Sequence, residues 1–165
     1  MTSAKDEASR RDAPPSVERL RAQVRAAWSG ATSPTPPLVD CPCPECTELE
    51  ERLRGRDWRS MDSSLADGLE QDLPLMGART FRTLLPAFLL AALDAESEVG
   101  EFLGDSLEPG EFNTPRFEGL SNAQGAAVLA FLRFDPEDDE DPGGADGPQR
   151  SIREYWQRFD GAQTR

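Results

Sequence analysis

One segment, residues 80–93, constrains the fold more than any other. It reads TFRTLLPAFLLAAL and is apolar around nearly the whole circumference of a helix. A helix that is apolar on every side is stable only when it is buried. Pro86 lies inside the segment, where a proline lacks the backbone N–H and clashes with the carbonyl four residues earlier. The sequence therefore predicts a central buried helix that either kinks at Pro86 or starts late.

The other apolar positions also recur at helical spacing, and no segment alternates as a β-strand does. Ser16 can cap the first helical segment, and Ser121 and Gln124 have the spacing of a capping box. Residues 56–77 are expected to form a loop with at most a short helical turn. A further short turn is expected near Phe102. Helices are expected at residues 16–30, 43–55, 80–93, 121–134 and 151–159. These patterns predict an all-α fold, a small irregular bundle of about five helices with long loops.

The domain organisation follows from where apolar residues are missing. Residues 1–15 are polar and charged, which predicts a disordered tail. Residues 135–148 hold seven carboxylates among glycines and prolines and lack the spacing of a calcium-binding loop, which predicts a flexible acidic loop. Residues 16–160 are expected to form a single helical domain. Within its last helix, one face carries aromatic side chains that favour packing on the core over binding a partner: Tyr155, Trp156 and Phe159.

The charge of the chain limits its partners. The net charge is −13, and residues 61–165 hold 8 basic and 21 acidic side chains. The negative electrostatic potential of such a chain repels nucleic acids and anionic membranes, and it favours a basic protein partner. No apolar run is long enough to span a bilayer or resembles a signal peptide, so we expect a cytoplasmic protein.

Several catalytic classes are excluded by composition. The chain has no histidine, which removes Ser-His-Asp and Cys-His nucleophile pairs and histidine metal sites. Its one lysine, Lys5, lies in the predicted tail, which argues against a phosphate-binding loop of the P-loop type. No spacing of carboxylates selects an acid and base pair. We therefore assign no catalytic residue and expect a non-enzymatic protein.

All three cysteines fall within the six residues CPCPEC, at Cys41, Cys43 and Cys46. The prolines after Cys41 and Cys43 favour extended backbone at both cysteines, while Pro44 suits the first position of a helix. Cys46 would then lie in the first turn of that helix. The three sulfur atoms are therefore expected to lie near one another, with Cys43 at the helix cap.

Three interpretations of this cluster stay open. In the first, Cys41, Cys43 and Cys46 bind zinc, and the fourth ligand is Asp40, a nearby glutamate, water or a group from a partner. In the second, Cys43 and Cys46 form a redox-active CxxC dithiol, although the β-α-β surroundings typical of thioredoxin are missing. In the third, at least one cysteine is a small buried side chain at a helix start. No cofactor is expected unless the cysteines bind zinc.

Three sequence elements, CPECTELEERLRGRDW, FRTLLPAFLLAALD and AVLAFLRF, together resemble an uncharacterised bacterial family, a domain of unknown function. The resemblance covers about residues 16–135 and includes a Cys-x-Glu-Cys element, a following tryptophan and an FRxxLPAFLLA helix. It implies a helical fold but no activity. Cys41 and the long acidic loop depart from the family pattern. The residues that match are Cys43, Glu45, Cys46, Trp58, Pro86, Phe88 and Leu89.

The leading functional prediction from sequence is a non-enzymatic acidic helical protein that binds a protein partner. A small antagonist or immunity-type partner of a basic protein has this charge and this lack of catalytic groups. The alternative is a zinc-binding or thiol-redox protein that acts through Cys41, Cys43 and Cys46.

Overall fold

The computed structural model describes residues 16–134 and 154–161. The predicted tail at 1–15, the predicted acidic loop at 135–148 and the start of the last predicted helix lie outside these residues. The described residues include seven α-helices and three 3-10 helices with named bounds, and residues 154–156 are also helical; none of the described residues forms a β-strand. The all-α prediction is therefore confirmed. The elements are α2 (Val17–Ala27), α3 (Pro44–Leu53), η1 (Trp58–Ser60), α4 (Ser63–Asp67), η2 (Glu70–Leu75), α5 (Ala78–Ala91), α6 (Val99–Leu107), α7 (Thr114–Phe117), α8 (Asn122–Leu132) and η3 (Gln157–Phe159).

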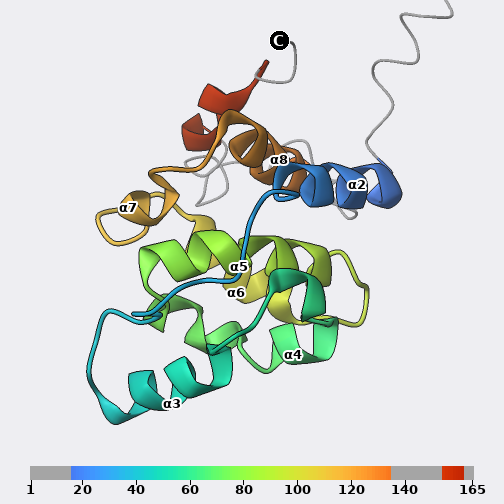
Figure 1. Ribbon diagram of the computed structural model, residues 1–165. Coiled ribbons are helices and arrows are strands. Elements are labelled where there is room, and N and C mark those ends of the chain that lie inside the picture. The colour runs from blue at the N-terminus through green and yellow to red at the C-terminus, as the bar shows by residue number, and fades with distance from the viewer. Residues whose placement is uncertain (1–15, 135–153, 162–165) are drawn as a thin grey trace, which may run out of the picture.

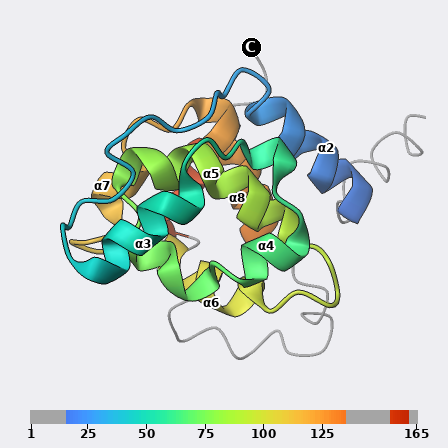
Figure 2. The ribbon, with the colours of Figure 1, turned by 60° about the horizontal axis from the view of Figure 1, so that its bottom comes forward.

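Helix α5 is the centre of the fold. It contacts α2, α4, α6, α7 and η1. Figure 1 shows α2 and α8 together on one side of α5, with α3 and α4 on the opposite side. Figure 2, tilted from that view, shows α3 and α2 at opposite edges of the molecule. The predicted burial of this segment is confirmed, because the large apolar side chains of α5 are fully enclosed: Phe81, Leu84, Leu85, Phe88 and Leu89.

Pro86 does not end α5, which runs from Ala78 to Ala91. Because Pro86 has no N–H, the carbonyl of Arg82 loses its partner within the helix. The indole N–H of Trp28 donates to this carbonyl at 2.9 Å. Trp28 follows the last turn of α2 and is 1% exposed. The proline therefore creates a buried acceptor, and the indole of Trp28 both satisfies it and fixes α2 against α5.

Replacing Trp28 by phenylalanine is expected to destabilise the fold by about 1 to 3 kcal/mol, because the Arg82 carbonyl is then buried without a donor. The same substitution in a Pro86→Ala background should cost about 1 kcal/mol less, since an alanine at this position would supply the missing helix N–H. Urea unfolding of the four proteins in this double-mutant cycle measures the difference. Equal costs in the two backgrounds would contradict the proposed link between Trp28 and Pro86.

The helix ends predicted from sequence are present. The Ser16 hydroxyl accepts the N–H of Arg19 at 3.3 Å. Ser121 and Gln124 form a complete capping box, with side-chain bonds in both directions. Gly55 follows α3 with a φ of +72°, a conformation that glycine adopts without strain. These local signals could be predicted because each depends on neighbouring residues only.

The segment expected as a loop, residues 56–77, is more helical than predicted. It contains η1, α4 and η2. Asp57 caps η1, and Asp62 caps α4 through a 2.9 Å bond to the N–H of Leu65. Leu69 and Leu73 are buried in the core. Short helical turns with one or two buried side chains have no clear periodicity, which explains why the pattern did not predict them.

The C-terminal segment docks against α8. Residues 154–156 are helical and continue into η3, so the described part of the last predicted helix agrees except for its 3-10 end. Trp156 is fully buried, and Phe159 is 8% exposed. The ring of Phe159 would lie 2.2 Å from a Cβ atom placed on Gly125, so this close approach requires glycine in α8. The prediction that the aromatic residues pack on the core is confirmed for Trp156 and Phe159, while Tyr155 is partly buried against it.

Candidate functional site

The backbone that leads into the cysteines is anchored to the core. Leu38 and Val39 are buried, and Val39 forms an isolated antiparallel bridge with Met76. The N–H of Gly77 donates to the carbonyl of Leu38 at 3.0 Å. Chain on both sides of the cysteine cluster is therefore fixed, by this bridge on one side and by α3 on the other.

The three cysteines meet at the start of α3, as predicted. Cys43 is the N-cap residue in extended conformation, and Pro44 occupies the first helical position. Cys46 lies in the first turn. The sulfur atoms of Cys41, Cys43 and Cys46 all lie within 4.8 Å of one another. The backbone N–H of Cys43 also donates to the sulfur of Cys41 at 3.3 Å, which holds that side chain beside the helix end.

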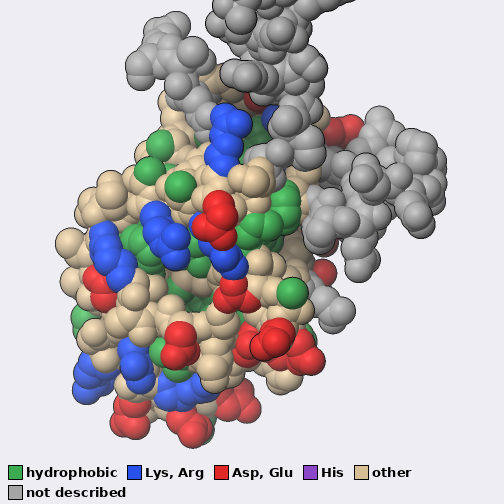
Figure 3. Space-filling view, turned by 90° about the vertical axis from the view of Figure 1, so that its right-hand side faces the viewer, with side chains coloured by type: hydrophobic (Ala, Val, Ile, Leu, Met, Phe, Trp, Pro, Cys, Tyr) green, Lys and Arg blue, Asp and Glu red, His purple; other side chains and the backbone are tan. Residues whose placement is uncertain are grey.

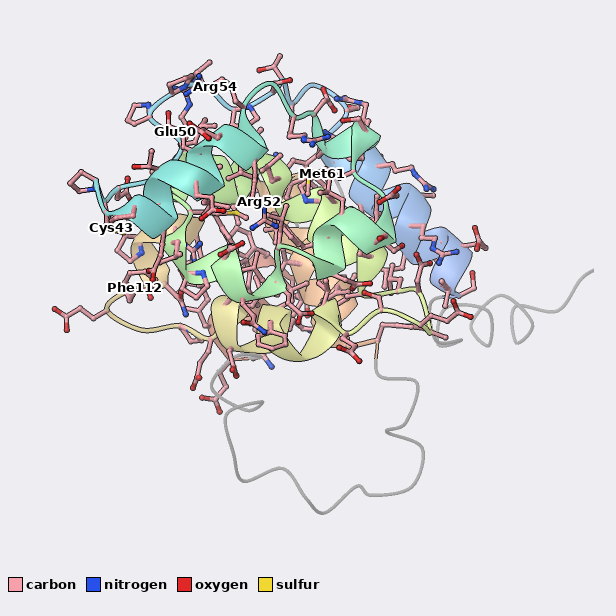
Figure 4. The ribbon with its side chains drawn as sticks, turned by 90° about the horizontal axis from the view of Figure 1, so that it is seen from below. Cys43, Glu50, Arg52, Arg54, Met61 and Phe112 are labelled. Carbon is pink, nitrogen blue, oxygen red and sulfur yellow. The ribbon has the colours of Figure 1, made fainter. Side chains whose placement is uncertain are left out.

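The cluster runs from the surface into the core. Cys41 is exposed, Cys43 is half-buried and Cys46 is 1% exposed. Figure 4 shows Cys43 at the edge of the molecule, at the start of α3. Cys46 continues the buried face of α3 that also carries Leu49 and Leu53. The packing interpretation therefore holds for Cys46, while the sulfur of the same residue faces the other two cysteines.

The surroundings of Cys43 and Cys46 shift the pKa values of their thiols in opposite directions. Hydrogen bonds from Cys41 and from the N–H of Cys46 lower the pKa of Cys43 below its usual value, because they stabilise the thiolate at the helix N-terminus. Burial, followed by the hydrogen bonds of the other two thiols, raises the pKa of Cys46 to about 12. At neutral pH Cys43 is therefore the more reactive thiol, and Cys46 retains its proton.

No fourth protein ligand completes the cluster within the part of the chain that the structure describes. Among residues 16–134 and 154–161, no aspartate or glutamate joins the three sulfur atoms. Asp40 was one predicted ligand, but its carboxylate lies against Gly77, where an added Cβ would be 2.9 Å from Oδ1. This placement turns the Asp40 carboxylate toward the backbone that anchors the loop instead of toward the thiols.

Asp40 has a charge partner in Arg116, which sequence analysis did not identify. Arg116 is 3% exposed, and its guanidinium lies 3.9 Å above the ring of Phe81. Burial lowers the pKa of Arg116 to about 10, and the negative charge of Asp40 partly offsets this effect. Arg116 also donates to the carbonyls of Leu73 and Met76. It therefore ties α7 to the segment that holds the cysteine loop.

A family described as a family of unknown function (DUF6714) matches residues 43–159. The chain belongs to this family. The match to the DUF6714 family begins at Cys43, later than the resemblance seen in the sequence, and it includes the docked C-terminal segment. Cys43 and Cys46 lie inside the matched range and Cys41 lies outside it. No curated protein and no solved structure matches the chain.

Among the helices formed by residues 16–134 and 154–161, none has the length and apolar character needed to cross a membrane.

Proposed function

We propose that this protein binds a zinc ion through the thiolates of Cys41, Cys43 and Cys46. The observation that carries the proposal is the convergence of three sulfur atoms within 4.8 Å of one another. Thiolates are ligands that zinc prefers, and each Zn–S bond is about 2.3 Å long. Small side-chain rotations from the observed arrangement would bring the three sulfurs to the corners of a zinc tetrahedron.

The fourth corner of this tetrahedron would face away from the core, since Cys46 contributes from the inside and Cys41 is exposed. Structural zinc sites have four protein ligands, whereas a site with three leaves a position for water or for another molecule. A partner protein could supply the last ligand. In this form the zinc site and the predicted protein partner belong to one function, in which the metal joins two chains.

Zinc affinity is expected to rise with pH, because each thiol must lose its proton to bind. The pKa of Cys46 is raised to about 12, so this thiol is protonated at neutral pH and releases its proton on binding. Each released proton contributes about tenfold in affinity per pH unit. Competition with a chelator of known affinity, measured between about pH 6 and 8, checks this slope. An affinity that does not change with pH would contradict thiolate ligation.

A dithiol function is the second candidate, and the contrast between the two cysteines of the CxxC element favours it. Cys43 is half-buried at a helix N-cap, whereas Cys46 is buried three residues later. An accessible attacking thiol followed by an enclosed one is the arrangement that thiol–disulfide exchange uses. Cys43 and Cys46 would together lose two electrons and two protons to a partner disulfide, which is reduced to two thiols. Both cysteines lie in the region that the DUF6714 family matches.

Binding of a basic protein partner remains a proposal that rests on charge. The described residues include 12 arginines and no lysine, against 21 aspartates and glutamates. Phe112, at 64% exposure, is the large exposed hydrophobic side chain of this part of the chain. Association driven by charge should weaken as salt is raised, because ions screen exposed charges. Partner retention that does not depend on salt would contradict a charge-driven contact.

A further inference from the structure

A groove lies between α2, η1 and the second half of α5, away from the cysteines. Its volume is about 730 Å³, which is within the range of small-molecule sites. Figure 3 faces this side of the molecule and shows basic side chains next to exposed hydrophobic ones. Figure 4 labels Met61, which lines the groove, and Cys43, and it shows that the two residues lie apart from each other.

Three arginines line the groove, and two of them are already engaged. Arg21 pairs with Glu18 and Asp94. The guanidinium of Arg59 donates to backbone carbonyls, including that of Ser29 at 2.6 Å. The side chain of Arg25 forms no hydrogen bond or ion pair with any residue in the described ranges. Arg25 is exposed and brings a positive charge to the groove.

The carboxylates at the groove have internal partners as well. Asp94 accepts hydrogen bonds from Arg21 and Ser63. Asp62 accepts the N–H of Leu65 and so caps α4. Both carboxylates would repel a ligand with several negative charges. The groove therefore favours a ligand with a single negative charge over a polyphosphate or a nucleic acid.

Trp58 also lines the groove, and its indole N–H lacks a hydrogen-bond acceptor among the described residues. Trp58 is 5% exposed. The other two tryptophans, by contrast, donate to the carbonyls of Arg82 and Leu107. A buried donor without an acceptor is unfavourable, and such groups in folded proteins call for a missing partner. Trp58 lines the groove, but its N–H is enclosed, so a ligand held there supplies the acceptor once the indole turns toward the groove.

We infer that this groove binds a small organic monocarboxylate with an apolar body. The carboxylate pairs with Arg25, and the Trp58 indole turns so that its enclosed N–H donates to a second acceptor or to the other carboxylate oxygen. The apolar body rests on the half-buried side chains of Met61 and Leu90. This site is independent of the cysteine cluster, so its test does not depend on the zinc proposal.

Titration with 2-naphthoate, followed by the indole N–H signals in ¹H–¹⁵N spectra, tests this inference. The three tryptophans give three indole signals, and Trp58→Phe identifies one of them. We expect saturable movement of the Trp58 signal, while those of Trp28 and Trp156 stay in place and report an intact fold. The uncharged methyl ester of the probe should bind at least about tenfold more weakly, because it cannot pair with a guanidinium.

Arg25→Gln should weaken binding about tenfold as well. Arg19→Gln is the matched control, because Arg19 lies on the same helix, is exposed and does not line the groove. It should leave the affinity unchanged. The inference is overturned if the Trp58 signal shows no saturable shift with 2-naphthoate, if the methyl ester binds equally well, or if the two arginine variants behave alike.

Discussion

Replacing Cys46 by serine is expected to lower zinc affinity by at least about 100-fold. Losing only a hydrogen-bond partner of a metal ligand lowers metal affinity by about 10- to 100-fold, so loss of a direct thiolate should exceed that range. Cys46 supplies the innermost of the three sulfur atoms and is 1% exposed. Serine is close in size and keeps the helix, so the fold should survive. Zinc titration against a competing chelator measures the change.

Asp40→Asn and Glu45→Gln are the controls for this prediction. Both residues are acidic and lie within the sequence around the thiols, yet neither carboxylate joins the sulfur cluster. Each variant should bind zinc with the stoichiometry of the parent protein. A loss in Asp40→Asn equal to that in Cys46→Ser would show that Asp40 is a ligand and that its observed place beside Gly77 changes on binding. Unchanged affinity in Cys46→Ser would remove the three-thiolate proposal.

Replacing Trp156 by alanine is expected to reduce the free energy of unfolding by about 3 to 5 kcal/mol, the range for removing a fully buried large aromatic side chain. The centroid of the Trp156 ring lies 4.8 Å from the ring centroid of Phe117 and 5.7 Å from that of Phe159. Its N–H donates to the carbonyl of Leu107 at 3.1 Å, and this acceptor would lose its partner. Urea unfolding monitored by circular dichroism gives the difference.

Gln157→Ala is the matched control for Trp156, because the neighbouring Gln157 is exposed. It should change the free energy of unfolding by less than about 0.5 kcal/mol. A loss below about 1.5 kcal/mol in Trp156→Ala would contradict the observed docking of the C-terminal segment. The family match extends to Phe159, so this result also tests whether the segment is part of the folded domain.

The fold was predictable wherever one segment carried its own signal. The apolar run around Pro86 indicated the buried central helix, and Ser121 with Gln124 indicated the start of α8. The interaction that accommodates Pro86 was not predictable, because Trp28 is 54 residues from its acceptor Arg82. Contacts of this kind depend on how helices are placed in space, which local periodicity does not specify.

In the candidate site, too, some positions could be predicted from the sequence and others could not. The positions of Cys43 at the cap and Cys46 in the first turn follow from proline and cysteine spacing, and the structure agrees. The placement of Asp40 could not follow from spacing, since Gly77 and the buried Arg116 come from distant segments. The groove beside α2 was also missed, because Arg25 and Trp58 come together only when α2 and η1 pack on α5. No short motif connects them.

The most direct test of the zinc proposal is to measure zinc content and thiol reactivity on one anaerobically purified sample, before and after a chelator. We predict one zinc ion per chain and no reaction at the exposed Cys41 or the half-buried Cys43 until the chelator removes the metal. Absence of zinc, together with full reaction of both thiols without chelator, would contradict the proposal. Absence of zinc with thiols that appear only after reduction would instead support the dithiol function of Cys43 and Cys46.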